Sequence, residues 1–327
     1  MKARQFITLC MAALCAMFVL AGCGKETQSM ETVRVGGLKG PTSMGLLFLK
    51  DQNEKGEARE NYEFTMATAA DELLTMMVKE ELDIALVPAN VASVLYNKTE
   101  GKVTVIDINT LGVLYMVSGD DSVKEPEDLR GRTVYLTGKG TTPDYVLHYI
   151  MEENGLSDGE VSLEYKSEAT EVAAILAEHP EAVGLLPQPF VTAACMQNEA
   201  LSVVMDMNDQ WTLLQGEEGS RMVTGVTVVR KAFLEEKEDV VKVFLQEHKE
   251  STESINKDTE TGSKLAVDAG IIAKEVIAKR AIPQCNITYM DGEEMKQALS
   301  GYLKVLYMQD AKAVGGALPE DDFYYIP

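Results

Sequence analysis

The feature that most constrains the fold of this 327-residue chain is a regular alternation of short apolar runs with amphipathic stretches. Between residues 33 and 206, runs as short as a β-strand are followed by stretches whose apolar residues recur every three or four positions. Such alternation is typical of βαβ units, which build mainly parallel sheets flanked by helices. We therefore predict an α/β fold.

The alternation can be divided into individual elements. The predicted strands are residues 33–35, 62–66, 84–87, 103–108, 133–136, 161–165, 183–186 and 201–205. The predicted helices are residues 44–52, 70–78, 90–96, 143–153, 170–178 and 190–197. The order of elements up to residue 108 resumes at residue 133, which indicates two related halves.

Two short motifs support this internal repeat. "KGPTSMGLL", which begins at Lys39, matches "KGTTPDYVL", which begins at Lys139. "DIALVPANV" aligns with "EAVGLLPQPF", so that Pro88 and Pro187 each end a buried strand. Chance is the alternative, because turns between strands and helices favour glycine, proline and threonine. A true repeat predicts two α/β lobes, whose loops at the carboxyl ends of the strands face a shared ligand cleft.

The N-terminus has the layout of a secretory signal. Lys2 and Arg4 precede an uncharged apolar run, residues 6–22, which closes on the sequence Leu-Ala-Gly-Cys at residues 20–23. This ending matches the lipobox of bacterial lipoproteins and predicts a signal peptide over residues 1–22, lipid on Cys23 and a polar tether over residues 23–30. A membrane-spanning helix is the alternative, but the run is at the lower limit of length.

The charge of the chain limits its partners. The sequence has 30 Lys and Arg residues against 52 Asp and Glu residues, a formal net charge of −22. A chain with this much negative charge repels nucleic acid and anionic membrane surfaces. We therefore expect no nucleic-acid partner. A solvated surface that keeps the protein soluble explains the charge most simply.

The two lysine-containing loops could hold an anion or a strong hydrogen-bond acceptor. Glycines let the backbone approach a ligand closely, and helix N-termini present free N–H groups. We predict that Ser43 caps the first helix and that Thr142 is the N-cap of the second, with Pro143 at its first position. Neither loop has the order of a P-loop or of a dinucleotide fingerprint, and tight turns alone are the alternative explanation of the glycines.

Motifs for catalysis or metal binding are lacking. The sequence has neither a G-x-S-x-G nor an H-E-x-x-H motif, and His148, His179 and His248 are interpreted as surface or helix-end residues. Cys195 and Cys285 have no CxxC context; a zinc site is improbable, and a disulfide between them is left open. We expect no cofactor, no metal and no enzymatic activity.

Several of these segments together resemble one protein family. They are the lipobox, "GGLKGPTSMG", "DIALVPAN", "LRGRTVYLTGKGTTPDYVLHYIMEENGL", "AVGLLPQPFVTAA" and "TGVTVVRKAF". They are similar to solute-binding lipoproteins of ABC transporters for sulfonates, taurine, nitrate and the pyrimidine precursors of thiamine. The resemblance implies a type II periplasmic-binding fold, with lobe 1 over residues 31–116 plus 207–327, lobe 2 over residues 117–206, and a hinge at residues 111–118 and 205–226.

The resemblance also implies positions for the ligand contacts. They are Gly37, Leu38, Lys39, Gly40, Pro41, Thr42 and Ser43, Ala89 and Asn90, Leu111 and Gly112, Gly138, Lys139, Gly140, Thr141 and Thr142, and Gln188 and Pro189. Family members often have an acid where this chain has Gln188, which puts a charged partner for a cationic ligand in doubt. Aromatic walls could come from Tyr62, Tyr115, Tyr145, Phe190 or Trp211, although each of these residue types is more often in the core.

The function implied by the resemblance is capture of a small organic or anionic solute by hinge closure. The protein would sit lipid-anchored on the extracytoplasmic face of a bacterial cell membrane and deliver the solute to ABC permease and ATPase subunits. A sensor or adhesion lipoprotein is one alternative. A pyrimidine-synthase-like enzyme is another, but the clustered cysteines of such enzymes are absent here.

Overall fold

The computed structural model describes residues 32–157, 159–216 and 219–327. The predicted signal peptide, the lipidation of Cys23 and the tether lie outside these residues. In the part of the chain that is described, no helix has both the length and the apolar character needed to span a membrane.

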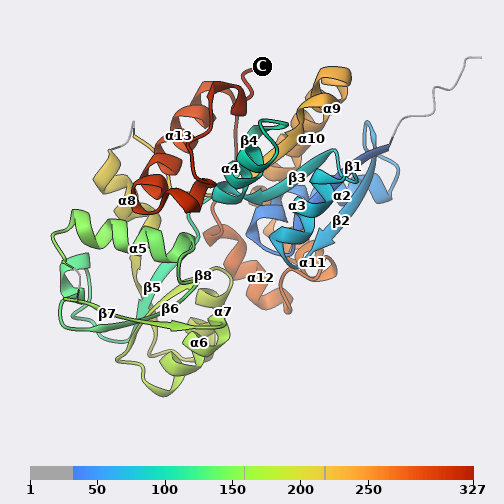
Figure 1. The fold of residues 1–327 in the computed structure, drawn as a ribbon. Coiled ribbons are helices and arrows are strands. Elements are labelled where there is room, and N and C mark those ends of the chain that lie inside the picture. Colours follow the sequence, from blue (N-terminus) through green and yellow to red (C-terminus); the bar gives the residue numbers. More distant parts are fainter. Residues whose placement is uncertain (1–31, 158, 217–218) are drawn as a thin grey trace, which may run out of the picture. The chain divides into compact units, whose positions relative to one another are not determined.

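The first sheet has six strands in the order β11-β4-β10-β3-β1-β2 (Figure 1). These are β1 (Thr32–Leu38), β2 (Asn61–Ala67), β3 (Ile84–Pro88), β4 (Val103–Leu111), β10 (Val223–Arg230) and β11 (Ile287–Met290). Strand β1 pairs in parallel with β2 and β3, while β10 runs antiparallel between β3 and β4. Strands β1 to β4 therefore all end at the same edge.

The second sheet repeats this order with five strands, β7-β6-β8-β5-β9. They are β5 (Leu114–Ser118), β6 (Thr133–Thr137), β7 (Ser162–Lys166), β8 (Val183–Pro187) and β9 (Ser202–Asp206). Here β6 pairs in parallel with β7 and β8, and β5 is the antiparallel strand. In each sheet the first strand that the chain forms after crossing from the other sheet runs antiparallel to both of its neighbours, and in the first sheet β11 also pairs antiparallel with β4. The predicted α/β fold class and the repeat in element order are confirmed.

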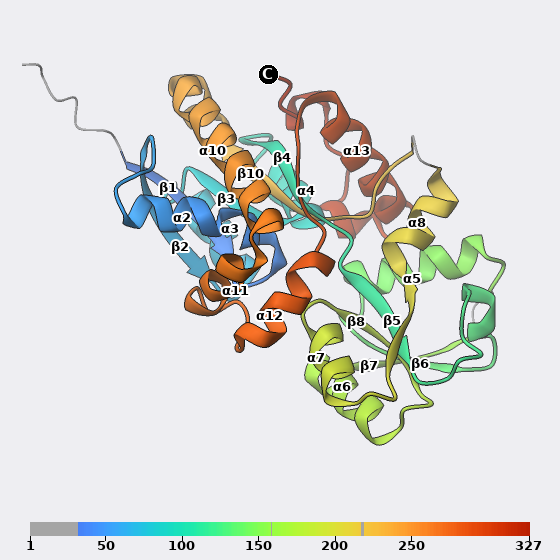
Figure 2. The same ribbon diagram turned by 180° about the vertical axis from the view of Figure 1, so that it is seen from behind.

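Helices cover both faces of each sheet (Figures 1 and 2). The α-helices are α2 (Leu47–Glu54), α3 (Ala70–Val78), α4 (Ala89–Lys98), α5 (Thr142–Glu153), α6 (Ala169–Glu178), α7 (Phe190–Gln197), α8 (Met207–Gln215), α9 (Lys231–Glu236), α10 (Glu238–Lys257), α11 (Thr259–Asp268), α12 (Glu275–Ala281) and α13 (Gly292–Gln309). On the first sheet, α3, α4 and α13 pack on one face and α2 and α10 on the other. On the second, α5 covers one face and α6 and α7 the other.

One hydrophobic cluster passes from the first sheet to the second. It contains Val87 of β3 and Leu303 of α13, and continues to Val146 of α5 and Leu136 of β6. Trp211 of α8 lies fully buried within it. The two sheets thus share apolar packing, while the lobe boundaries at residues 116–117 and 206–207 stay a prediction.

Three local predictions are wrong. The first helix is preceded by a 3-10 helix, η1 (Pro41–Leu46), whose N-cap is Gly40, so Ser43 lies within a helical turn and caps nothing. Thr142 is the first residue of α5, and Thr141 is its N-cap. In both turns the helical conformation starts earlier than predicted, because the preceding glycine-rich backbone already bends the chain. His248, expected at the surface or a helix end, is fully buried on α10.

A buried carboxylate joins the first sheet to its connections. Asp83, immediately before β3, accepts hydrogen bonds from Nη2 of Arg34 (2.6 Å) and Nη2 of Arg230 (2.7 Å), and from the backbone N–H of Arg34 (3.0 Å). Burial alone raises the pKa of this carboxyl, but these hydrogen bonds outweigh burial and hold the pKa below its ordinary value. Asp83 therefore stabilises the fold as the charged form.

We expect Asp83→Asn to lower the free energy of unfolding at pH 7 by about 3 kcal/mol, the low end for a broken buried pair because Arg34 is partly exposed. Since the folded pKa is depressed, this contribution is present above about pH 4 and is lost as the pH falls through the folded value. Urea unfolding over a pH series measures it. Asp51→Asn, which removes the surface partner of Lys55, is the control and should change little. Equal losses in the two variants would contradict the role assigned to Asp83.

Candidate functional site

The carboxyl edges of the two sheets meet where the chain first crosses between them. Strand β4 ends at Leu111 and β5 begins at Leu114, which pairs with Pro187 at the end of β8. The backbone N–H of Gln188 donates to the carbonyl of Val113 at 3.0 Å. The structure therefore brings three predicted positions, Leu111, Gly112 and Gln188, to one junction. In open α/β sheets, ligands bind at this kind of edge.

The first loop follows β1 to the same edge and buries two hydroxyl groups. Thr42 is 6% exposed and Ser43 is fully buried, and no atom of the described residues forms a hydrogen bond with either side-chain oxygen. A Cβ atom at Gly37 would lie 2.5 Å from the Ser43 oxygen, so only glycine leaves room for it. Because a buried hydroxyl without a partner is costly, a polar ligand atom could relieve that cost here.

A glycine of β10 makes room for the same loop. A Cβ at Gly225 would lie 2.5 Å from Cγ2 of Thr42 and 2.4 Å from Oδ1 of Asn109. Sequence reasoning missed Gly225, although a lone glycine inside the strand "VTGVTVVR" is the known signal for a close approach of another segment. The loop can therefore lie directly on the strand.

Backbone groups of the second loop form hydrogen bonds within the loop and with the start of α5. Gly138 and Gly140 have φ values of +77° and +71°, a region that favours glycine. The Thr141 hydroxyl donates to the carbonyl of Gly138 at 2.5 Å, and the N–H of Gly140 donates to Asp144 at 2.7 Å. Asp144 is itself buried and also accepts from the Tyr165 hydroxyl at 2.6 Å. The Gly140 amide thus already has an anionic partner at the start of α5.

One of the two loop lysines lies over an aromatic ring. The Lys139 ammonium lies 5.2 Å from the centre of the Tyr165 ring on β7. The Lys39 ammonium lies 3.9 Å from the position that a Cβ of Gly270 would take, in the turn that follows α11. The amide groups of two other predicted residues also have partners: Asn90 donates to the carbonyl of Ala313 (3.4 Å), and Gln188 accepts from the Thr192 hydroxyl (2.8 Å).

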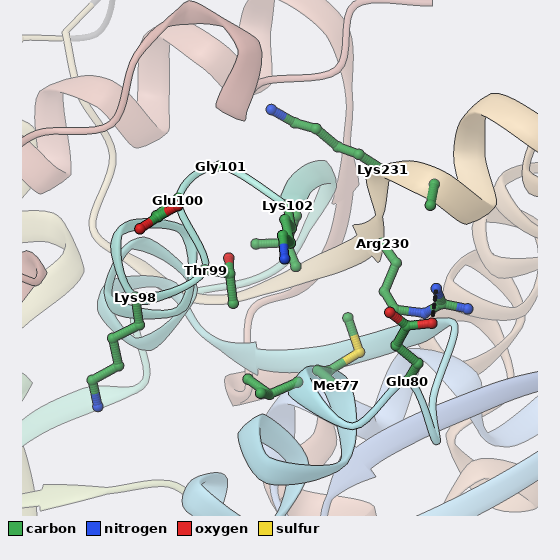
Figure 3. Close-up of a pocket in the computed structure, with 12 residues that line it drawn as sticks. Met77, Glu80, Lys98, Thr99, Glu100, Gly101, Lys102, Arg230 and Lys231 are labelled. Atoms are coloured by element: carbon green, nitrogen blue, oxygen red, sulfur yellow. Dashed lines mark ion pairs between the residues drawn. The ribbon is translucent and has the colours of Figure 1, made fainter.

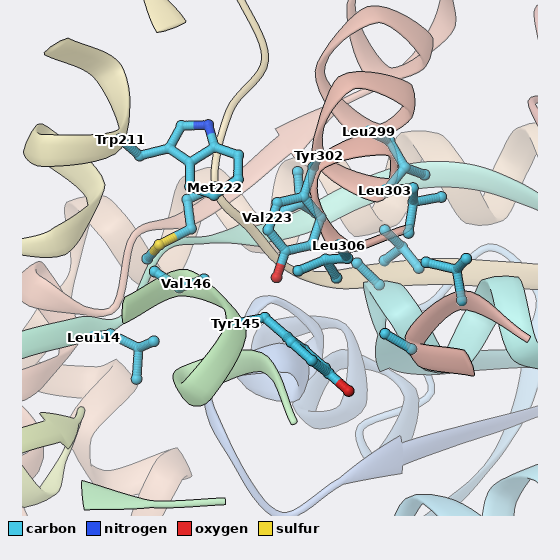
Figure 4. Packing of buried hydrophobic residues seen from close by; sticks show 14 of the residues in the cluster. Leu114, Tyr145, Val146, Trp211, Met222, Val223, Leu299, Tyr302, Leu303 and Leu306 are labelled. Atoms are coloured by element: carbon cyan, nitrogen blue, oxygen red, sulfur yellow. The ribbon is translucent and has the colours of Figure 1, made fainter. Parts of the chain in front are cut away.

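Helix α13 adds a residue to this region that sequence reasoning did not find. Tyr302 is fully buried, its hydroxyl has no hydrogen-bond partner of adequate geometry, and Thr142 is its polar neighbour. In Figure 4 the hydroxyl points toward Tyr145 of α5. Burial raises the pKa of Tyr302, so the hydroxyl keeps its proton and can donate it. No sequence signal marks Tyr302 beyond its place on the apolar face of α13.

The predicted aromatic walls mostly belong to the core. Trp211 packs with tilted rings against Tyr302 (ring centres 5.4 Å apart; Figure 4) and Tyr149 (4.8 Å). Tyr62 packs near Phe244. Tyr115 and Tyr145 lie nearer the junction. Their hydroxyls donate to the carbonyl of Gln284 (2.7 Å) and to the Asp310 carboxylate (3.3 Å). Both bonds connect the second sheet or its α5 helix to segments that follow β10.

A pocket of about 660 Å³ lies at the opposite edge of the first sheet and contains none of the predicted site residues. The carboxyl ends of α3 and α4 line it, together with Arg230, which forms an ion pair with Glu80 (3.6 Å) (Figure 3). Lys98 is the last residue of α4 and Lys102 follows it, near the helix end whose dipole favours cations. None of these charged residues is a predicted ligand position.

Groups suited to catalysis or metal binding are scarce within the described residues. No cluster of three or more His, Cys, Asp or Glu side chains there could hold a metal ion. The thiols of Cys195 and Cys285 are both free, and burial raises the pKa of Cys285 to about 12. Nε2 of His148 lies 3.3 Å from Oδ1 of Asp144. A protonated thiol is a poor nucleophile, so neither cysteine suits covalent chemistry.

Comparison with known proteins agrees with this geometry. A family model described as NMT1/THI5 like matches residues 100–261. The comparison with curated proteins gave no significant match. Three similar crystal structures are an ABC transporter from Parabacteroides distasonis (TM-score 0.75, 24% identity, 90% of this chain and 98% of that chain covered), the periplasmic aliphatic sulphonate binding protein SsuA from Escherichia coli (0.73, 14%, 91% and 93%), and the alkanesulfonate-binding protein SsuA from Xanthomonas axonopodis pv. citri bound to MOPS (0.62, 13%, 88% and 94%). The resemblance inferred from the sequence is confirmed, and the fold is that of periplasmic binding proteins.

We expect Gly225→Ala to destabilise the protein by about 1–3 kcal/mol, because the new methyl group would collide with Thr42 and Asn109. Thermal unfolding measures the loss. Gly40→Ala is the matched control: it lies in the same loop, has an extended backbone (φ −171°) and has no atom within 4 Å of an added Cβ. If the two variants melt at the same temperature, the first loop does not pack on β10 as described.

Proposed function

We propose that this chain, which carries an NMT1/THI5 like domain over residues 100–261 on the fold of periplasmic binding proteins, captures a small solute for an ABC importer. One observation carries the proposal: the buried hydroxyls of Thr42 and Ser43, which have no hydrogen-bond partner among the described residues, belong to the predicted ligand loop, and the buried Tyr302 hydroxyl lies beside Thr142 of the opposite loop. Buried polar groups without a hydrogen-bond partner are rare in native proteins, so each one needs an explanation. A bound solute would supply the missing hydrogen-bond partner.

The chemistry of these groups suits a polar organic solute. Hydroxyls both donate and accept hydrogen bonds, and the Tyr302 proton is held on its oxygen by burial. The Lys139 ammonium lies over the Tyr165 ring, so the second loop would contribute to affinity through hydrogen bonds and enclosure more than through paired charge. Solutes with a sulfonate, carboxylate or ring carbonyl offer the acceptors that such hydroxyls need.

Capture would work by closure of the two lobes around the solute. The chain crosses between the sheets at residues 112–113 and again through α8 and the segment that leads to β10. These two crossings would allow one half to rotate against the other, and a solute would shift this equilibrium only by its greater affinity for the closed form. The permease and ATPase subunits of the importer would then recognise the closed form. The proposed lobes are residues 31–116 plus 207–327 and residues 117–206.

We expect one solute in a panel of sulfonates including MOPS, nitrate, bicarbonate, thiamine precursors and flavins to raise the thermal transition. A ligand at 100 times its Kd adds about 2.7 kcal/mol to the stability of the folded form. Thr42→Val keeps the shape of the side chain and removes the hydroxyl, so it should reduce the shift without unfolding the protein. Mass spectrometry of the recovered solute should find it unchanged. A panel without any shift, or a chemically altered solute, would rule out the proposal.

We further propose that lipid on Cys23 holds the protein to the extracytoplasmic face of the cell membrane. The support is the apolar run and the small residues that precede this cysteine. We expect the parent chain expressed in a bacterium to fractionate with membranes and to incorporate labelled palmitate, and Cys23→Ser to lose both properties. Cys195→Ser is the control and should keep both. Palmitate incorporation that survives Cys23→Ser would refute this anchor.

A further inference from the structure

A series of buried polar side chains runs through the first half of the molecule, behind the first loop. Its centre is Asp107 of β4, which is fully buried. One carboxylate oxygen accepts from the Thr227 hydroxyl of β10 at 2.9 Å, and the other lies 3.3 Å from Nδ1 of His248. The Thr227 oxygen also accepts from the side-chain amide of Asn109 at 3.2 Å. A carboxyl group this deep in a protein needs such partners, and here they form a continuous series.

Both ends of this series reach η1, the turn that carries Thr42 and Ser43. At one end, the Thr110 hydroxyl lies 3.0 Å from Oδ1 of Asn109 and 3.4 Å from the carbonyl of Pro41. Its single proton can serve either acceptor. At the other end, a Cβ at Gly45 would lie 3.2 Å from Nε2 of His248. The same series of side chains therefore contacts the first residue of η1 and its penultimate residue.

Helix α10 presents further polar groups to the same segment. Ser251 accepts a hydrogen bond from the backbone N–H of Leu49 in α2 at 3.0 Å. The Thr252 oxygen would lie 2.7 Å from a Cβ at Gly45. His248, Ser251 and Thr252 are each no more than 3% exposed. The buried face of a surface helix is ordinarily apolar, so polar residues there indicate a task other than burial of apolar area.

Two aromatic rings pack against one end of this network. The Phe244 and Tyr289 rings have their centres 5.5 Å and 6.0 Å from that of His248. Neither ring forms a hydrogen bond with the imidazole. At this depth hydrogen bonds to a carboxyl group are strong and directional, which favours a single arrangement of the groups. The network lies behind η1, and none of its members is a predicted ligand position.

We propose that the series Thr110–Asn109–Thr227–Asp107–His248 is a positioning device for η1. It holds the turn so that the Thr42 and Ser43 hydroxyls keep the orientation that the solute requires. The part of this inference that concerns affinity rests on the proposed solute-binding function. The part that concerns the order of the loop is independent of it.

Hydrogen exchange of the ligand-free protein tests the device, with Thr227→Val as the variant. Valine keeps the shape of threonine and removes the hydroxyl that joins Asp107 to Asn109. We expect the backbone N–H groups of Thr42 to Leu46 to exchange at least about ten-fold faster, the equilibrium effect of one lost hydrogen bond to a charged group. Thr227→Ser keeps the hydroxyl and should exchange like the parent.

Thr104→Val is the matched control for stability. Thr104 is equally buried, lies on β4 toward the other edge of the sheet, and bonds the carbonyl of Phe323 at 2.9 Å. The Thr104→Val variant should be less stable than the parent, but the backbone N–H groups of η1 should not exchange selectively faster. Equal exchange at η1 in the Thr227→Val and Thr104→Val variants would overturn the inference. MOPS is the probe for solute binding. If the parent does not bind MOPS but Thr227→Val alone loosens η1, the positioning role stands and the result counts against the proposed solute-binding function. If the parent and Thr227→Val bind MOPS equally tightly, and η1 exchanges at the same rate in both, the positioning role is wrong and the solute-binding function is unaffected.

Discussion

The backbone pairing of β5 with β8 is the constraint on which the site depends. Strand β5 begins three residues after β4 ends, and its first residue, Leu114, pairs with Pro187. This pairing anchors the carboxyl edge of one parallel sheet to that of the other. Strand β10 makes the reciprocal crossing, since it returns from the second sheet to lie between β3 and β4. Loops that are about 100 residues apart in the sequence are thereby assigned to facing edges, which is the arrangement that a two-lobed binding protein needs.

Buried polar groups define the chemistry that this arrangement offers. Thr42 and Ser43 have hydroxyls without hydrogen-bond partners among the described residues, whereas the Asp107 carboxyl behind η1 has a partner on each oxygen. The first set lies in the predicted ligand loop. The second lies behind that loop, between α10 and the sheet. Its carboxyl group can hold neighbouring groups in place, although Nε2 of His248 has no partner among the described residues.

Local patterns predicted the elements well because strands and helices depend on near neighbours in the chain. The strand that ends at Pro88 and the helix that ends at Val78 were found at their predicted positions. Capping at Ser43 and Thr142 was wrong, since the exact start of a helix depends on how the glycines before it bend. The prediction that His248 lies at the surface or a helix end was wrong for a different reason. Its polar neighbours in "QEHKES" suggested a surface, but Asp107, 141 residues earlier in the sequence, makes its burial tolerable.

The amino-acid sequence by itself determined the α/β class, the repeated order of elements and the positions of the loops. Each of these follows from the spacing of apolar residues, glycine and proline along the chain. Only the tertiary structure decided which side chains meet: that Lys139 lies over Tyr165, that Gly225 admits Thr42, and that Tyr302 lies beside Thr142. Contacts of this kind join residues far apart in sequence, and they are settled by packing and by the pairing of buried polar atoms, which no local pattern records.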